Sequence, residues 1–272
     1  HAHAQTAPAS ELTLHGRDGS PTNRCHGALG SEELLSASFG PRQDPTHALI
    51  GHINASKSKV DVMAFWWTWL PIAEALVDAH MRGVQVRVLV DSRTTTKPVE
   101  GRDLVRPFGH DASTTVAYLQ SQGVPVKVMR PAQHRKAIFH HKAVIVDSKF
   151  VCMGSSNWYS LSLRTFDDLT VCLCSLRTAE RFTEFTERRW TSSGWPAAKE
   201  TVSTKSCPPS PSDTSAQAAP TRAGSSISAF EVVEGPYFGP ECRLDHVWFR
   251  YIASATRQVR IVHWRVEWEP LV

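Results

Sequence analysis

The chain has no run of apolar residues approaching the roughly 20 that a membrane-spanning helix needs. It also has little excess charge of one sign, since 30 Lys and Arg against 26 Asp and Glu leave a net charge of +4. None of its six cysteines has the spacing of a zinc-binding motif. These absences argue against a spanning helix, a strongly basic nucleic-acid module and a zinc finger. An apolar content of 41% and a charged content of 21% fit a soluble globular protein.

The first residues and the cysteines bear on localisation. The chain begins at His1, and Ala2-His3-Ala4 is typical of the small-x-small end of a cleaved secretory signal, although the start of a fragment explains it equally well. Cys25, Cys207 and Cys242 lie in loop-like contexts, where an oxidising compartment could pair two of them. We therefore expect a secreted, periplasmic or lumenal protein.

Apolar periodicity predicts alternating helices and strands after a polar lead-in at 1–30. The predicted helices cover about 46–58, 71–82, 113–122 and 178–190, and the predicted strands about 59–66, 84–91, 124–129, 140–157 (two strands joined by a turn) and 169–174. This alternation indicates an α/β layered domain over 31–190. Residues 191–228, rich in Ser and Pro, are typical of a linker or inserted loop.

An internal repeat begins after that linker. Phe39-Gly40-Pro41 recurs as Phe238-Gly239-Pro240, and the same offset of 199 residues aligns five further identical residues, at 47, 53, 60, 69 and 71. We therefore expect residues 229–272 to be the beginning of a second repeat, and the chain to be the first part of a longer protein. The alternative is a single-copy enzyme that dimerises and carries a degenerate tail.

The most informative stretch runs from His140 to Asn157. Strand alternation places His140 and Lys142 on one face, and a turn at Asp147 returns the chain so that Ser155 and Asn157 lie beside them. A nucleophile or base, a fixed cation and two neutral donors are thereby brought together. This combination suits a phosphoryl group.

The stretch resembles the signature of the phospholipase D superfamily, which is His-x-Lys, four residues, Asp, six residues and Gly-Ser-x-Asn. Six residues fill it without a gap, namely His140, Lys142, Asp147, Gly154, Ser155 and Asn157. The resemblance implies a mixed β-sheet flanked by helices on both faces. It also implies an acidic residue about ten positions downstream, for which Asp168 is the better match than Asp167, although the family usually has Glu there.

The chemistry of phosphodiester cleavage assigns roles to these residues. A neutral His140 can attack phosphorus in line and give a phosphohistidine, with Asp168 holding its other ring nitrogen. Lys142 and Asn157 would hold the non-bridging oxygens, and Ser155 would orient a phosphate oxygen or a neighbouring side chain. We expect Asp147 to be structural, bound to local backbone or to a basic group.

Some features remain open. A second His must protonate the leaving oxygen, and the resemblance implies that it comes from another repeat or another subunit. No metal or cofactor is implied. Trp66 and Trp67 could stack on bases, contact lipid or pack in the core, and Arg135 lies in a basic loop that either attracts an anionic substrate or is simply solvated.

We therefore expect a phosphodiesterase of the phospholipase D type that hydrolyses or transfers a phosphodiester. Its substrate is a phospholipid or a nucleic acid, its partner is a second phospholipase D-like half, and peripheral contact with a membrane is possible. The alternative is a catalytically silent binding or scaffold protein of the same fold.

Overall fold

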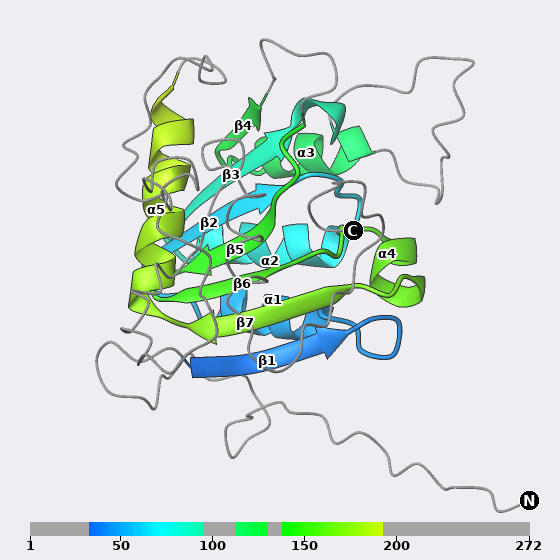
Figure 1. Ribbon diagram of the computed structural model, residues 1–272. Helices are drawn as coiled ribbons and strands as arrows, with labels where there is room; N and C mark the ends of the chain where they lie inside the picture. The colour runs from blue at the N-terminus through cyan, green and yellow to red at the C-terminus, as the bar shows by residue number, and fades with distance from the viewer. Residues whose placement is uncertain (1–32, 95–111, 130–137, 193–272) are drawn as a thin grey trace, which may run out of the picture. The chain divides into compact units, whose positions relative to one another are not determined.

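The computed structural model describes residues 33–94, 112–129 and 138–192. They form one seven-stranded sheet in the order β1-β7-β6-β5-β2-β3-β4 (Figure 1). β2, β3 and β4 are parallel to one another, and every other neighbouring pair is antiparallel. The strands are β1 (Glu33–Phe39), β2 (Lys59–Ala64), β3 (Gln85–Asp91), β4 (Val126–Met129), β5 (Lys142–Val146), β6 (Phe150–Gly154) and β7 (Leu169–Cys174).

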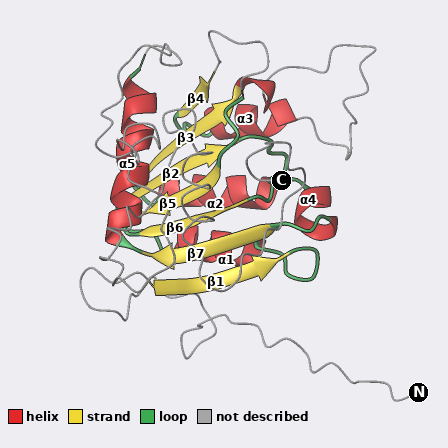
Figure 2. Ribbon diagram, viewed as in Figure 1, coloured by secondary structure: helices red, strands yellow, loops and turns green. Residues whose placement is uncertain are grey.

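Helices cover both faces of this sheet (Figure 2). The helices are α1 (Thr46–Asn54), α2 (Leu70–Met81), α3 (Ala112–Ser121), α4 (Ser160–Thr165) and α5 (Leu176–Thr191), with a short 3₁₀ turn, η1 (Ser92–Thr94), after β3. Alternate strand residues such as Val62, Val88 and Val144 form one apolar core with residues of α1 and α2. α5 packs against the opposite face of β2, β5 and β6. The expected mixed α/β architecture is confirmed.

Element boundaries differ from the sequence prediction where tertiary contacts decide them. The first helix ends at Asn54 rather than near 58, and β2 ends at Ala64 rather than Trp66. The last helix begins at Leu176, because the hydroxyl of Ser175 accepts the amide of Thr178 as an N-cap. β1 was not predicted at all. It pairs only with β7, at the edge of the sheet.

The face under α5 contains buried charge. Arg87 donates to both carboxylate oxygens of Asp61 and, at 2.8 Å, to Glu187 of α5. The sequence places Glu187 among the outward residues of this helix, and its side chain is indeed half exposed, but its carboxylate binds β3. A buried Arg needs such partners, so this network fixes where α5 lies on the sheet.

Some predictions fall outside the described residues: the lead-in at 1–30, nearly all of the linker at 191–228, the second repeat at 229–272, and the pairing of Cys25, Cys207 or Cys242. Within the described part, a disulfide joins Cys152 of β6 to Cys172 of β7. No helix of the described ranges has the length and apolar character needed to cross a membrane.

Asp147 holds the β5–β6 turn to the start of β2. Its carboxylate accepts the backbone amides of Lys57, Ser58 and Lys59 and the hydroxyl of Ser58, at 2.8–3.2 Å. Partial burial opposes ionisation, but these donors outweigh it and hold the pKa of Asp147 below its ordinary value. Asp147 and Ser148 have φ values of 52° and 50°, a conformation that Asp tolerates better than most residues.

We expect Asp147→Asn to lower the free energy of unfolding by about 1–2 kcal/mol, the difference between hydrogen bonds to a charged and to a neutral acceptor. Asn tolerates the same backbone angles, so the change isolates the charge. Because the folded pKa is depressed, the deficit is present above the ordinary pKa of 3.8 and fades as the pH falls below it. Urea denaturation at several pH values measures this, with the exposed Asp78→Asn as the control. Equal stability of the two variants would contradict the assignment.

Candidate active site

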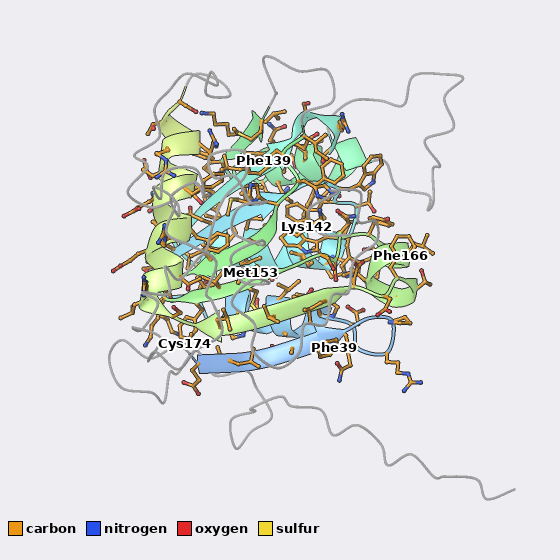
Figure 3. The ribbon with its side chains drawn as sticks, viewed as in Figure 1. Phe39, Phe139, Lys142, Met153, Phe166 and Cys174 are labelled. Atoms are coloured by element: carbon orange, nitrogen blue, oxygen red, sulfur yellow. A yellow bond between two sulfur atoms is a disulfide. The ribbon has the colours of Figure 1, made fainter. Side chains whose placement is uncertain are left out.

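The ends of four neighbouring strands lie side by side at one end of the sheet. β5 begins at Lys142, and its antiparallel neighbour β6 ends at Gly154 beside that point. β7 begins at Leu169 opposite the end of β6, and β2 ends at Ala64, which pairs with Lys142. Figure 3 labels Lys142 and, beside α4, Phe166, toward this end of the strands. The topology therefore gathers the signature at this end of the strands, except for Asp147, which lies in the β5–β6 turn at the other end.

The loop that carries Asn157 is held by backbone hydrogen bonds to the loop after β2. The amide of Trp158 donates to the carbonyl of Trp66, and the carbonyl of Trp158 accepts the amides of Thr68 and Trp69, at 2.9–3.0 Å. The rings of Trp67 and Trp158 meet edge to face below this contact, with their centroids 5.1 Å apart. Buried aromatic packing thus fixes the backbone on which Asn157 sits.

Gly154 allows β7 to approach the end of β6 closely. A Cβ at this position would lie 2.0 Å from the carbonyl oxygen of Leu169, which no side chain tolerates. The same carbonyl accepts the amide of Ser155 at 2.8 Å. The glycine of the signature is therefore required by backbone contact between β6 and β7.

The Asp168 carboxylate lies at the centre of the hydrogen-bonded part of the site. One oxygen accepts the hydroxyl of Ser155 at 2.7 Å, and the other accepts the hydroxyl of Ser162 at 2.8 Å. Its neighbour Asp167 is exposed, so the geometry favours Asp168 as the acidic residue of the site. The expected bond between Asp168 and the ring of His140 is not formed among the described residues, and the two carboxylate oxygens bind serine hydroxyls instead.

Ser162 is a site residue that the sequence analysis missed. It is fully buried on α4, and its oxygen also accepts the backbone amide of Asn157 at 2.9 Å. It therefore joins the loop of Asn157 to the Asp168 carboxylate. The available signal was weak: a hydroxyl five residues after Asn157 and six before Asp168, in a segment too short to show helical periodicity.

His140 and Lys142 share an aromatic neighbour. The ring of Phe65 lies edge-on to the ring of His140, with their centroids 4.6 Å apart, and the Lys142 ammonium lies 5.1 Å from the same ring. The ammonium also donates to the His140 carbonyl at 2.9 Å. Phe65 is half-buried against the proposed nucleophile.

The same surroundings set the ionisation of both groups. Loss of hydration lowers the pKa of His140 to about 4, and the nearby positive charge of Lys142 adds to the shift. Burial lowers the pKa of Lys142 to about 8, although the negative charge of Asp168 opposes part of this change. At neutral pH the site therefore presents a neutral imidazole, exposed on the surface, beside an ammonium that still carries its charge.

Two neighbours fix the segment that enters the site. Asp91, fully buried at the end of β3, accepts the amide of Phe139 at 2.6 Å. His141 lies on the α5 side of the sheet, where its ring packs against Phe139 and Phe185. His140 and His141 therefore lie on opposite faces of the sheet, and His141 has a packing role.

The residues predicted to bind substrate have different positions. Trp67 is fully buried and its ring nitrogen donates to the carbonyl of Trp69, so it is a core residue, and the prediction that it contacts substrate is wrong. Trp66 is half-buried against Phe65. Arg135 lies outside the described residues.

The two polar ends of the Asn157 side chain have different surroundings. A hydrogen bond joins the Asn157 side chain to the hydroxyl of Tyr159, and burial raises the pKa of that hydroxyl. Its carbonyl oxygen is buried and has no partner in the described part of the chain. Burying an unpaired polar atom costs about 1–3 kcal/mol, and such atoms are more often found where a ligand binds.

The comparisons with known proteins agree with this geometry. The model of the family described as "Cardiolipin synthase, PLD-like domain" matches residues 49–190, more than half of the chain. The chain belongs to the phospholipase D superfamily. The match begins in α1 and ends in α5, so it includes all of the signature.

Individual relatives are distant. The mitochondrial cardiolipin hydrolase of Chlamydomonas reinhardtii is 19% identical over 141 residues, covering 52% of this chain and 55% of that protein. The chain thus spans about half the length of this curated relative. Nuc, a phospholipase D family member from Salmonella typhimurium, is 24% identical with a TM-score of 0.50, over 59% of this chain and 95% of Nuc. NucT from Helicobacter pylori is 19% identical with a TM-score of 0.48, over 60% and 98%.

We expect Ser162→Ala to loosen the link between the loop of Asn157 and Asp168. It removes one donor to the carboxylate and the acceptor of the Asn157 amide, which should lower the free energy of unfolding by about 1–3 kcal/mol. The Asn157 amide should also exchange with solvent faster than other loop amides, as measured by NMR. Ser160→Ala, on the same helix, is the matched control and should leave both unchanged. An unaltered exchange rate in Ser162→Ala would refute the link.

Proposed function

We propose that the protein is a phosphodiesterase of the phospholipase D type that works through a phosphohistidine on His140. The observation that carries this proposal is the convergence of the exposed His140 imidazole and the buried Lys142 ammonium on Phe65, at the strand ends where Asn157 and Asp168 also lie. A neutral imidazole has the free electron pair that nucleophilic attack requires.

In the first step a ring nitrogen of His140 attacks phosphorus. A P–N bond forms, the P–O bond to the leaving group breaks, and the leaving oxygen takes a proton from an acid on the opposite side. Lys142 offsets the negative charge on the non-bridging oxygens. Asp168 acts by positioning, since it holds Ser155 directly and Asn157 through Ser162, and its charge keeps Lys142 protonated at higher pH.

The acid on the opposite side comes from a second phospholipase D-like half. His140 cannot attack phosphorus and also protonate an oxygen on the far side of it. We propose that a second repeat or another copy of the chain supplies the second His. Water or an alcohol then attacks the phosphohistidine, which makes the overall reaction a hydrolysis or a transfer.

The substrate is a phospholipid or a nucleic acid. The matching family description and the curated relative both name cardiolipin, which supports the phospholipid. The half-buried Trp66 and Phe65 beside the site would suit an acyl chain or a base equally well. Vesicles containing cardiolipin or phosphatidylcholine, tested in parallel with single-stranded DNA, separate the two classes.

Export to an oxidising compartment is also part of the proposal. The disulfide between Cys152 and Cys172 supports it, because such bonds persist mainly outside the cytosol.

We expect the chain to become labelled when it is incubated with a ³²P-labelled bis(4-nitrophenyl) phosphate and quenched. Nitrophenolate leaves without a proton, so this substrate needs only the half-site that the chain contains. The label should be acid-labile, as a phosphoramidate is, and it should disappear in His140→Ala.

The matched control is His141→Leu, which keeps the apolar contacts of the neighbouring position and should retain the label. A label that survives in His140→Ala would rule out this nucleophile. Absence of label from the wild-type chain, even after a second half is added, would favour the catalytically silent binding protein instead.

We expect the labelling rate to depend on pH as a bell. It should fall below pH of about 4, where His140 gains a proton, and above pH of about 8, where Lys142 loses its charge. In Lys142→Arg the basic limb should move to higher pH, because a guanidinium stays charged. Single-turnover rates between pH 3 and about 10 provide the measurement. A basic limb that stays in place in Lys142→Arg would assign it to another group.

A further inference from the structure

Three metal-ligating side chains converge in the core behind the site described above. His52 of α1, Cys152 of β6 and Cys172 of β7 each offer a donor atom, and these atoms all lie within 4.8 Å of one another. All three side chains are buried, at 3%, 2% and 1% exposure. Cys152 and Cys172 are directly opposite each other in the β6–β7 ladder and form a disulfide.

The position of His52 is unusual for an apolar core. The residue lies in the last turn of α1, on the face that packs against the sheet, and its ring stacks on Phe150 with centroids 6.0 Å apart. Leu49 and Ile53 of the same helix and Phe150 of β6 all belong to the hydrophobic core. An imidazole costs desolvation free energy here that a leucine would not.

We propose that Cys152, Cys172 and His52 form a zinc site while the cysteines are still thiols, before export to an oxidising compartment closes the disulfide. The site goes beyond the phosphodiesterase function and does not depend on it. Two thiolates and one imidazole are a donor set that zinc prefers, at about 2.3 Å for sulfur and about 2.0–2.1 Å for nitrogen. Donor atoms already within 4.8 Å of one another reach that geometry by small side-chain rotations. These residues supply three of the four ligands that zinc usually has.

Charge balance favours a divalent metal. Zn²⁺ with two thiolates and a neutral imidazole has no net charge, so the complex can remain in a core where an isolated ion would not. A monovalent metal would leave a net negative charge.

The disulfide becomes a zinc site in two steps. A trialkylphosphine transfers two electrons to the disulfide and takes an oxygen atom from water, giving the phosphine oxide and two thiols. Zn²⁺ then displaces two protons and binds the two thiolates. The cross-link between β6 and β7 is thus replaced by one that also includes α1.

The sequence could not reveal this site. The three residues lie 100 and 20 positions apart, far from any zinc-binding spacing, and only the pairing of β6 with β7 under α1 brings them together. The expectation that no metal is needed for phosphodiester cleavage is unaffected, because this cluster lies in the core rather than at the strand ends.

The test uses the full chain with Cys25, Cys174, Cys207 and Cys242 replaced by Ser, so that only one cysteine pair remains. The protein is reduced with a water-soluble phosphine, which does not compete strongly for metal, and titrated with Co²⁺ as the spectroscopic probe. We expect thiolate-to-cobalt charge transfer in the near ultraviolet that saturates at one equivalent and is abolished by Zn²⁺. The oxidised protein should show none.

Matched variants assign the ligands. His52→Ala should weaken Co²⁺ binding by at least about tenfold, since even outer-shell partners of metal ligands are worth that much. His47→Ala, on the exposed face of the same helix, should bind as the parent does. Cys152→Ser should remove most of the charge-transfer band.

The proposal is overturned if the reduced parent shows no charge-transfer band, or if His52→Ala and His47→Ala bind Co²⁺ with equal affinity. Circular dichroism checks that each variant is folded. If His52→Ala is unfolded, His52→Gln replaces it, and the Tm of the reduced parent is measured with and without Zn²⁺. Zinc that binds only the folded chain must raise the Tm, so an unchanged Tm contradicts the site.

Discussion

The Asp168 carboxylate is the point on which the arrangement of the site depends. Its two oxygens bind the hydroxyls of Ser155, after β6, and Ser162, in α4, and Ser162 in turn holds the backbone of Asn157. The carbonyl of Asp168 also accepts the amide of Gly40, at the end of β1. One residue therefore joins β1, β6, β7 and α4 at the edge where the signature gathers. A longer Glu side chain, usual in the family, would have to fit the same pair of serines differently.

Burial and charge act together on the other half of the site. Lys142 is almost fully buried, which weakens its hold on a proton, and the charge it retains discourages protonation of His140. The negative charge of Asp168 moderates the first effect. Between the pKa of His140, about 4, and that of Lys142, about 8, the imidazole is therefore neutral while the ammonium is charged.

The signature allowed much of this to be predicted, because its residues sit on strands whose period of two fixes their faces. A structural role for Asp147 follows from the same alternation, but the predicted partner was local backbone or a basic group, whereas the carboxylate binds backbone amides 89 and 90 residues away in the chain. Ser162 and Phe65 escaped prediction, since each reaches the site through a tertiary contact that leaves no periodic pattern. The role of Trp67 could not be decided from the sequence for a related reason: an aromatic residue at a strand end can belong to the core or to a binding surface, and only its packing against Trp158 decides.

The pairing of β6 with β7 holds both the phosphoryl site and the Cys152–Cys172 cluster in place. Ser155 leaves β6 and Asp168 precedes β7, so their hydrogen bond requires the two strands to keep one register. Gly154 permits the close approach at the site end, and the Cys152–Cys172 bond, two residues further along each strand from the Gly154–Thr170 pair, fixes the same register covalently. A change of one residue in register would turn every side chain of one strand to the opposite face. It would move Ser155 away from Asp168 and the two sulfurs away from each other at once. The core cluster and the phosphoryl site therefore depend on a single alignment, although they share no residue.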